Sequence, residues 1–174
     1  ELLKDYAKFC KDVVISDGTN SLATERALKQ FKTDLLILGQ AGILRQNILK
    51  IPKIGTLNGH PGVLPFYRGI DCPHWAIFNR DFDKIGASIH WVEQGIDTGK
   101  IIATEKFPVK GMSDISTLEA CLYTLCSEMI AKVVIKINNG DYPDGTIQLI
   151  NEGQQYYKMS YKQLKASEAI LQGL

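Results

Sequence analysis

The chain has 174 residues, of which 45% are hydrophobic and 22% charged, a balance that is typical of a globular protein and excludes a disordered chain. Its 20 basic and 19 acidic residues leave a net charge of +1, which argues against nucleic acid or an anionic membrane as partner. No stretch approaches the roughly 18 apolar residues that suggest a membrane span, so we expect a soluble, cytoplasmic protein.

Cysteine and histidine spacing gives no indication of a metal site. The four cysteines form no CxxC pair, which favours reduced thiols. Cys121 and Cys126 lie in an apolar helical segment, where small buried residues are the ordinary explanation. The three histidines lack the close helical spacing and acidic companions of a zinc site, so we expect no metal.

The first part of the chain alternates helical and extended patterns. Residues 1–12 predict a short helix, and the β-branched run at 12–16 (DVVIS) predicts a buried strand. Apolar residues at helical spacing over 22–31 predict a helix that Ser21 caps. The apolar run at 34–38 (DLLIL) predicts a second buried strand.

The middle of the chain continues this alternation, with a short helix at 44–49, a strand at 55–58 that runs into His60-Pro61-Gly62, and a helix at 72–79. Strands that alternate with helices favour right-handed crossovers. We therefore predict an α/β fold, in the form of a Rossmann-like, mostly parallel sheet with helices on both faces.

The second half begins with two extended segments, 86–92 and 100–107, around a loop at 93–99. The longest helix is expected at 115–138, with a glycine cap in Asn139-Gly140-Asp141.

The C-terminal part is expected to hold a strand at 146–150 and a last helix at 161–173. We expect one domain, formed by residues 1–150, with residues 151–174 as a C-terminal extension packed on it.

A polar pair lies where the 55–58 strand ends, the edge at which open α/β sheets gather ligands. If the strand continues to His60, the period of two places Asn58 and His60 on one face, and Gly59 leaves room for a ligand. An amide beside an imidazole suits stabilisation of an oxygen that gains negative charge when an amine attacks a carbonyl.

Asp97 is the candidate proton acceptor, in the tight loop between Gly95 and Gly99. It could take the proton of the attacking amine or raise the imidazole pKa by its charge, and the sequence leaves both roles open. Each feature also has a structural explanation, because His-Pro-Gly and Asp-X-Gly are common turns and Asn often caps helices.

Three segments in the same order and spacing resemble the formyltransferases that use 10-formyltetrahydrofolate. They are DLLILGQAGIL (34–44), LNGHPGVLPFYRG (57–69) and GASIHWVEQGIDTGKII (86–102). The group includes glycinamide ribonucleotide transformylase, methionyl-tRNA formyltransferase and sugar-nucleotide N-formyltransferases. The resemblance implies the formyltransferase fold, of which the first strand and the glycine-rich loop after it are expected to be absent here.

The resemblance also implies roles for the site residues. Asn58 and His60 would hold and polarise the formyl carbonyl, and Asp97 would organise water and accept protons. The donor, 10-formyltetrahydrofolate, would lie between two loops that supply backbone groups and apolar side chains. The implied donor-binding residues are Gln40, Gly42, Ile43, Leu44, Glu93 and Ile96.

The acceptor amine is implied less directly. Tyr67 and Arg68 could contact an acceptor phosphate, although a guanidinium that anchors the loop explains Arg68 equally well. A histidine at position 90 matches purine-type relatives, whereas tRNA-type relatives usually have an apolar residue there and add a C-terminal domain. His90 is therefore a candidate acceptor-binding residue.

The resemblance to sugar-nucleotide enzymes rests on His-Pro-Gly, Tyr-Arg-Gly and Trp75-Ala76-Ile77. It favours a nucleotide-linked amino sugar, such as a dTDP-amino sugar, as acceptor. The alternatives are a glycinamide ribonucleotide formyltransferase, a formyltetrahydrofolate hydrolase and a noncatalytic folate-binding domain. A homodimer is a further expectation.

Overall fold

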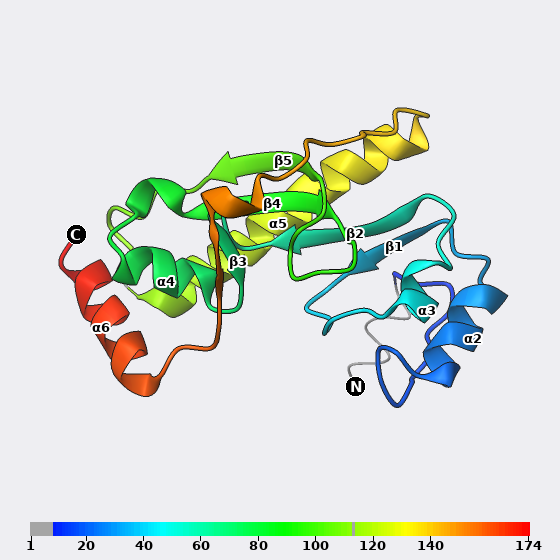
Figure 1. The fold of residues 1–174 in the computed structure, drawn as a ribbon, viewed down its shortest axis with the longest axis horizontal. Helices are drawn as coiled ribbons and strands as arrows, with labels where there is room; N and C mark the ends of the chain where they lie inside the picture. The colour runs from blue at the N-terminus through cyan, green and yellow to red at the C-terminus, as the bar shows by residue number, and fades with distance from the viewer. Residues whose placement is uncertain (1–8, 113) are drawn as a thin grey trace.

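A four-stranded mixed sheet forms the centre of the computed structural model, which describes residues 9–112 and 114–174 (Figure 1). Its order is β1-β2-β4-β5. The strands span Leu35–Leu38 (β1), Gly55–His60 (β2), Gly86–Trp91 (β4) and Ile101–Lys106 (β5). The pair β1–β2 is parallel, and β4 is antiparallel to both β2 and β5. The predicted α/β class is confirmed.

Strand direction is mostly parallel but not uniform, because β1, β2 and β5 run one way and β4 runs the other. Parallel neighbours need a crossover of about a dozen residues or more, usually through a helix. The loop between β4 and β5 holds no helix and joins these strands as a hairpin. This short connection accounts for the antiparallel pairing of β4 with β5.

Within the described residues, five α-helices accompany the sheet: Leu22–Gln30 (α2), Gln46–Leu49 (α3), Cys72–Phe78 (α4), Ile115–Asn138 (α5) and Tyr161–Gln172 (α6). Short 3₁₀ helices span Phe82–Lys84 and Ile150–Glu152. As predicted, the Ser21 side chain caps α2 by accepting the Thr24 N–H. Gly140 follows the C-terminus of α5 with φ of 84°, which is the conformation of a glycine cap. Among the described helices, none is long and apolar enough to cross a membrane.

The two faces of β2 and β4 differ in what covers them. α5 packs against one face, where Gly59 lies so close to Cys126 and Ile130 that an added Cβ would lie within 3.0 Å of both side chains. On the opposite face the loop after β2 packs against β4. There the Ser88 hydroxyl donates to the Gly62 carbonyl at 2.8 Å and accepts the Leu64 N–H at 3.0 Å. Ser88 thereby fixes the loop after β2 to that face of the sheet.

A second, two-stranded sheet ties the C-terminal part to the middle of the chain. Here β3 (Tyr67–Gly69) pairs in parallel with β6 (Gln154–Tyr156), and α6 packs against α4 (Figure 1). The main core lies between α5, α4 and the sheet. Its most deeply buried members include Leu57, Ile77, Ile85, Ala87, Ile89, Leu118 and Leu122.

Two predicted strands are wrong. Residues 12–16 lie outside any strand and are exposed, with Ile15 76% accessible, because no described strand runs beside them to complete a hydrogen-bonding ladder. Residues 146–150 form a single bridge, between Thr146 and Ile101, before a 3₁₀ turn begins. Most of the helix predicted at 1–12 lies outside the described residues, and residues 9–12 are not helical.

Candidate active site

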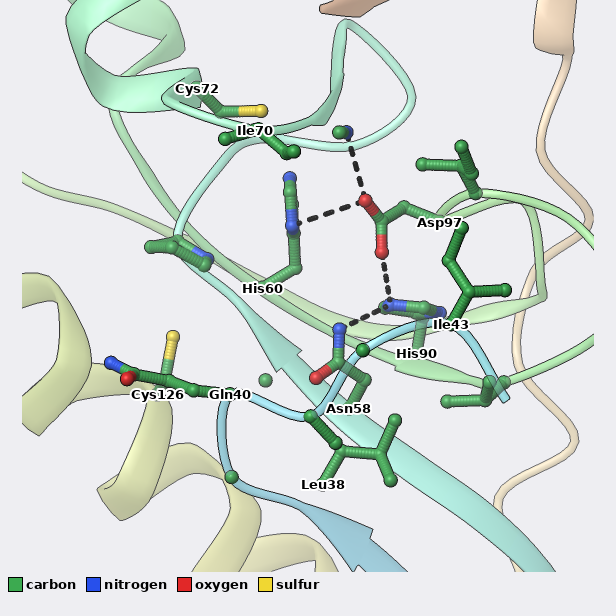
Figure 2. Close-up of a pocket in the computed structure, with 18 of the residues that line it drawn as sticks. Leu38, Gln40, Ile43, Asn58, His60, Ile70, Cys72, His90, Asp97 and Cys126 are labelled. Atoms are coloured by element: carbon green, nitrogen blue, oxygen red, sulfur yellow. Dashed lines mark hydrogen bonds and ion pairs between the residues drawn. The ribbon is translucent and has the colours of Figure 1, made fainter. Parts of the chain in front are cut away.

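Two neighbouring strands carry the polar centre of the site. In β2, Asn58 and His60 lie on one face, and in the antiparallel partner β4 the residue opposite Asn58 is His90. The Asn58 side-chain Nδ2 lies 3.2 Å from His90 Nε2 (Figure 2). Both histidines are almost fully buried. Because side chains alternate between the two faces of a strand, an amide and two imidazoles lie together on one face.

Asp97 reaches this group from the loop after β4. Its Oδ2 lies 3.5 Å from His60 Nδ1, and its Oδ1 lies 3.4 Å from His90 Nε2 (Figure 2). The Gly69 N–H donates to Oδ2 at 2.9 Å. One carboxylate therefore contacts both imidazoles and a backbone donor from β3.

Backbone carbonyls fix the protonation pattern of both rings. His60 Nε2 lies 2.8 Å from the Tyr67 carbonyl, and His90 Nδ1 lies 2.8 Å from the Trp91 carbonyl. A carbonyl accepts only an N–H, so each of these two nitrogens carries a proton, and in the neutral His60 ring Nδ1 carries none. The remaining nitrogens, His60 Nδ1 and His90 Nε2, face Asp97. His60 Nδ1 therefore has a lone pair that can accept a proton, and it lies beside the Asp97 carboxylate.

Burial and charge act in opposite directions on this cluster. Burial lowers the pKa of His60, while the charge of Asp97 and the hydrogen bond to Tyr67 raise it, and the net change is downward. Burial raises the pKa of Asp97, but hydrogen bonding to His90, the charge of His60 and the Gly69 N–H lower it to about 2. At neutral pH the site holds an ionised carboxylate beside a neutral His60.

A cavity of about 760 Å³ opens beside this cluster. It is lined by every predicted site residue except Tyr67 and Arg68, and so brings together the segment after β1 and the loop after β4. These lining residues are Gln40, Gly42, Ile43, Leu44, Asn58, His60, His90, Glu93, Ile96 and Asp97. Ile43 is 69% exposed, an apolar side chain at the mouth of a cavity. A flat apolar ring with polar edges fits such a site.

Tyr67 and Arg68 lie elsewhere, contrary to expectation. The Tyr67 hydroxyl donates to Asp81 at 2.6 Å, and its ring stacks on Tyr156 with centroids 4.8 Å apart. The Arg68 guanidinium is buried and donates to the carbonyls of Pro65 and Ile150 at 3.3 and 3.1 Å. Both side chains are buried outside the cavity, and Arg68 anchors the loop backbone there.

The sequence interpretation missed one wall of the cavity. It is formed by residues of α5 together with the N-cap and first two residues of α4. These residues are Asp71, Cys72, Pro73, Glu119, Tyr123, Cys126, Ser127 and Ile130. Helix α5 can form this wall because it approaches Gly59 closely. In the sequence, only the glycine between Asn58 and His60 indicated that another backbone or side chain comes close to this strand.

No group of three or more His, Cys, Asp or Glu residues within 9–112 and 114–174 is arranged to hold a metal ion.

Comparison with known proteins places the site in a family. Residues 12–134 match the family described as formyl transferase. Methionyl-tRNA formyltransferase of Methylacidiphilum infernorum is 35% identical over 128 residues, which cover 73% of this chain and 40% of that protein. The corresponding enzyme of Azobacteroides pseudotrichonymphae is 34% identical over 142 residues, 79% of this chain and 42% of that protein. The chain thus spans about 40% of the length of these relatives.

Solved structures share the fold. The formyltransferase PseJ from Anoxybacillus kamchatkensis, in complex with UDP-4,6-dideoxy-4-formamido-L-AltNAc and tetrahydrofolate, matches with a TM-score of 0.64 and 20% identity, over 89% of this chain and 79% of that one. Glycinamide ribonucleotide transformylase 1 from Symbiobacterium toebii matches with a TM-score of 0.61 and 23% identity, over 68% and 56%. The expected formyltransferase fold is confirmed.

Proposed function

Because the chain belongs to the formyl transferase family, we propose that it carries the centre that transfers a formyl group from 10-formyltetrahydrofolate to a primary amine. The observation that carries the proposal is the arrangement around one cavity. Asn58, His60 and Asp97 lie together at one wall, and a segment with an exposed isoleucine forms another. Reactive polar groups and an apolar binding slot thus share one space.

The donor is proposed to bind between residues 40–44 and the loop around Ile96. Both segments line the cavity and offer backbone polar groups beside apolar side chains, which suits a pterin ring. Solved relatives of the same fold support this assignment, since PseJ and HypX from Aquifex aeolicus were each obtained with the tetrahydrofolate form of the carrier. 10-Formyltetrahydrofolate would supply the formyl carbon.

The chain's residues then have defined tasks in the transfer. As the amine nitrogen bonds to the formyl carbon, the amide N–H of Asn58 would stabilise the negative charge that develops on the formyl oxygen. His60 Nδ1 would accept a proton from the amine, with the charge of Asp97 stabilising the imidazolium. The carbon–nitrogen bond to the carrier then breaks, and the carrier nitrogen takes the proton, which leaves a formamide and tetrahydrofolate.

For the acceptor we propose an amino sugar linked to a nucleotide. PseJ and a likely sugar N-formyltransferase from Mycobacterium tuberculosis share the fold and support this class. Asp71 and Glu119 also line the cavity, and their carboxylates would attract a cationic amine to that wall. The second candidate is an aminoacyl-tRNA, which is favoured by the identity of about 35% to methionyl-tRNA formyltransferases.

The test is a release assay for tetrahydrofolate. The protein is incubated with 10-formyltetrahydrofolate and, separately, a dTDP-amino sugar, glycinamide ribonucleotide, methionyl-tRNA or no acceptor. Release that requires the amino sugar, and occurs with none of the other acceptors, supports the proposal. Release that requires methionyl-tRNA would identify an aminoacyl-tRNA as the acceptor instead. Release without acceptor identifies a hydrolase. No release with any acceptor, while tetrahydrofolate still binds, leaves a folate-binding domain without transfer.

A further inference from the structure

A buried glutamine from the C-terminal part of the chain holds the loop that carries Asp97. The Gln148 side-chain amide donates from Nε2 to the Asp97 carbonyl at 2.9 Å and to the Gly99 carbonyl at 2.6 Å. The residue is 6% exposed and does not line the cavity. Gln148 therefore contacts the backbone of the loop without access to a substrate.

The segment that carries Gln148 is hydrogen-bonded to the sheet at both ends of the Asp97 loop. Thr146 exchanges two backbone hydrogen bonds with Ile101, at 2.9 and 2.7 Å. Just before it, the Pro143 carbonyl accepts the Trp91 indole N–H at 2.9 Å. Trp91 and Ile101 are the last residue of β4 and the first of β5, so this segment is attached at the two points where the Asp97 loop leaves and re-enters the sheet.

The loop needs such support because its backbone is unusual. Asp97 has φ of 51°, in the left-handed region that residues with a Cβ disfavour. A residue stays there only when neighbouring groups over-determine its conformation. Gln148 binds the carbonyl of this residue directly and the carbonyl two residues on, so it bridges the strained position.

The carboxylate of Asp97 is held from the opposite side by the same C-terminal region. Its Oδ2 accepts the Gly69 N–H, and Gly69 lies in β3, which pairs with β6. The carbonyl of Ile150 accepts a hydrogen bond from Arg68, next to Gly69. Residues 146–156 thus fix both the backbone and the side-chain partner of Asp97.

From these contacts we propose that Gln148 is a positioning residue, which fixes the Asp97 backbone so that the carboxylate faces His60 and His90 together. Its amide acts as a clamp between two loop carbonyls rather than as a group that touches the reactants. The inference rests on the proposed function only for its catalytic consequence. The geometric consequence, the placement of Asp97 against the two imidazoles, stands independently.

The kinetic test compares Gln148→Met, which removes both hydrogen bonds, with Ile147→Ala, a neighbouring residue that is 73% exposed. We expect Gln148→Met to lower kcat by about 10- to 100-fold, the cost of a misplaced catalytic group, with the KM for the folate donor changed less than about threefold. In an Asp97→Asn background the same change should have no further effect. Equal kcat in both single variants, or an undiminished loss in the Asp97→Asn background, would overturn the proposal.

A second measurement does not depend on activity. Nitrogen NMR of the histidine rings should show altered signals for His60 and His90 in Gln148→Met and unchanged signals in Ile147→Ala. Unchanged rings in both variants would overturn the positioning role even if the protein transfers no formyl group. Should Gln148→Met unfold in a thermal scan, Gln148→Asn is measured in the same assays, because it keeps a neutral amide on a shorter side chain that should not bridge both carbonyls.

Discussion

His60 Nδ1 and Asp97 Oδ2 lie 3.5 Å apart, although one residue ends a central strand and the other lies in a hairpin loop. The Tyr67 carbonyl occupies the other ring nitrogen, so Nδ1 is the only basic atom of His60 that a proton can reach. A proton taken up by the His60 ring therefore binds to the nitrogen that faces the Asp97 carboxylate.

Asp97→Asn should lower kcat for formyl transfer by at least about 100-fold, because it removes the negative charge that stabilises protonated His60. The amide keeps an oxygen for the Gly69 N–H, so the loop and tetrahydrofolate binding should be retained. Fluorescence titration with tetrahydrofolate and steady-state rates measure the two effects. Asp144→Asn, an exposed carboxylate that pairs with Lys100, is the control, and wild-type rates in Asp97→Asn would remove Asp97 from the mechanism.

The pH dependence of kcat/KM should reflect the lowered pKa of His60. A proton acceptor acts in its neutral form, and burial lowers the pKa of this ring below 6.5, so the rate should hold as the pH falls to 6.5 and decline only below it. Asp97 raises that pKa, so Asp97→Asn should move the residual acid limb to still lower pH. A limb that starts above pH 7, in a profile taken with one acceptor, would assign the proton to another group.

Gly62→Ala should damage the site by steric contact. A Cβ at this position would lie 2.7 Å from His60 Nε2 and 3.1 Å from the Cys72 Cβ, so the ring would lose its hydrogen bond to Tyr67. We expect a loss of about 100-fold in kcat, the scale of a misplaced catalytic group. Gly18→Ala, which meets nothing within 4 Å, is the matched control. Normal rates in Gly62→Ala would mean that the loop yields without moving His60.

Arg68→Met should act on stability rather than on acceptor binding. It leaves the carbonyls of Pro65 and Ile150 without their donor, which costs roughly 1–3 kcal/mol for the buried Pro65 carbonyl and less for the partly exposed Ile150 carbonyl. Thermal unfolding should therefore shift down, with the KM for the acceptor unchanged in folded protein. Arg26→Met, at an exposed helical position, is the control. A raised KM at unchanged stability would restore the expected phosphate contact.

Local patterns predicted the part of the site that one strand contains. The period of two placed Asn58 and His60 on one face, and the strand does extend to His60. The partnership with Asp97 could not follow from periodicity, since it depends on how a hairpin folds over β2, and the family resemblance supplied it. The catalytic roles of the three residues stay predictions.

The failures share one physical cause, which is pairing between distant segments. The β-branched run at 12–16 has strand propensity, yet a strand exists only with a neighbour to bond. Arg68 has the residue type that binds phosphate, but β3 pairs with a strand more than 80 residues later, and that pairing buries the guanidinium. In both cases the structure depends on a pairing partner, or its absence, which the local sequence does not reveal.

Helix α5 contacts the core with some of its side chains and the cavity with others. Leu118, Leu122 and Met129 belong to the core, while a stripe between them that includes Glu119, Tyr123 and Ser127 faces the cavity. We propose that this stripe contacts the acceptor, so exchange of its residues should change which acceptor is used. None of these three residues belongs to the core cluster, so their exchange should leave the packing of α5 on β2 intact.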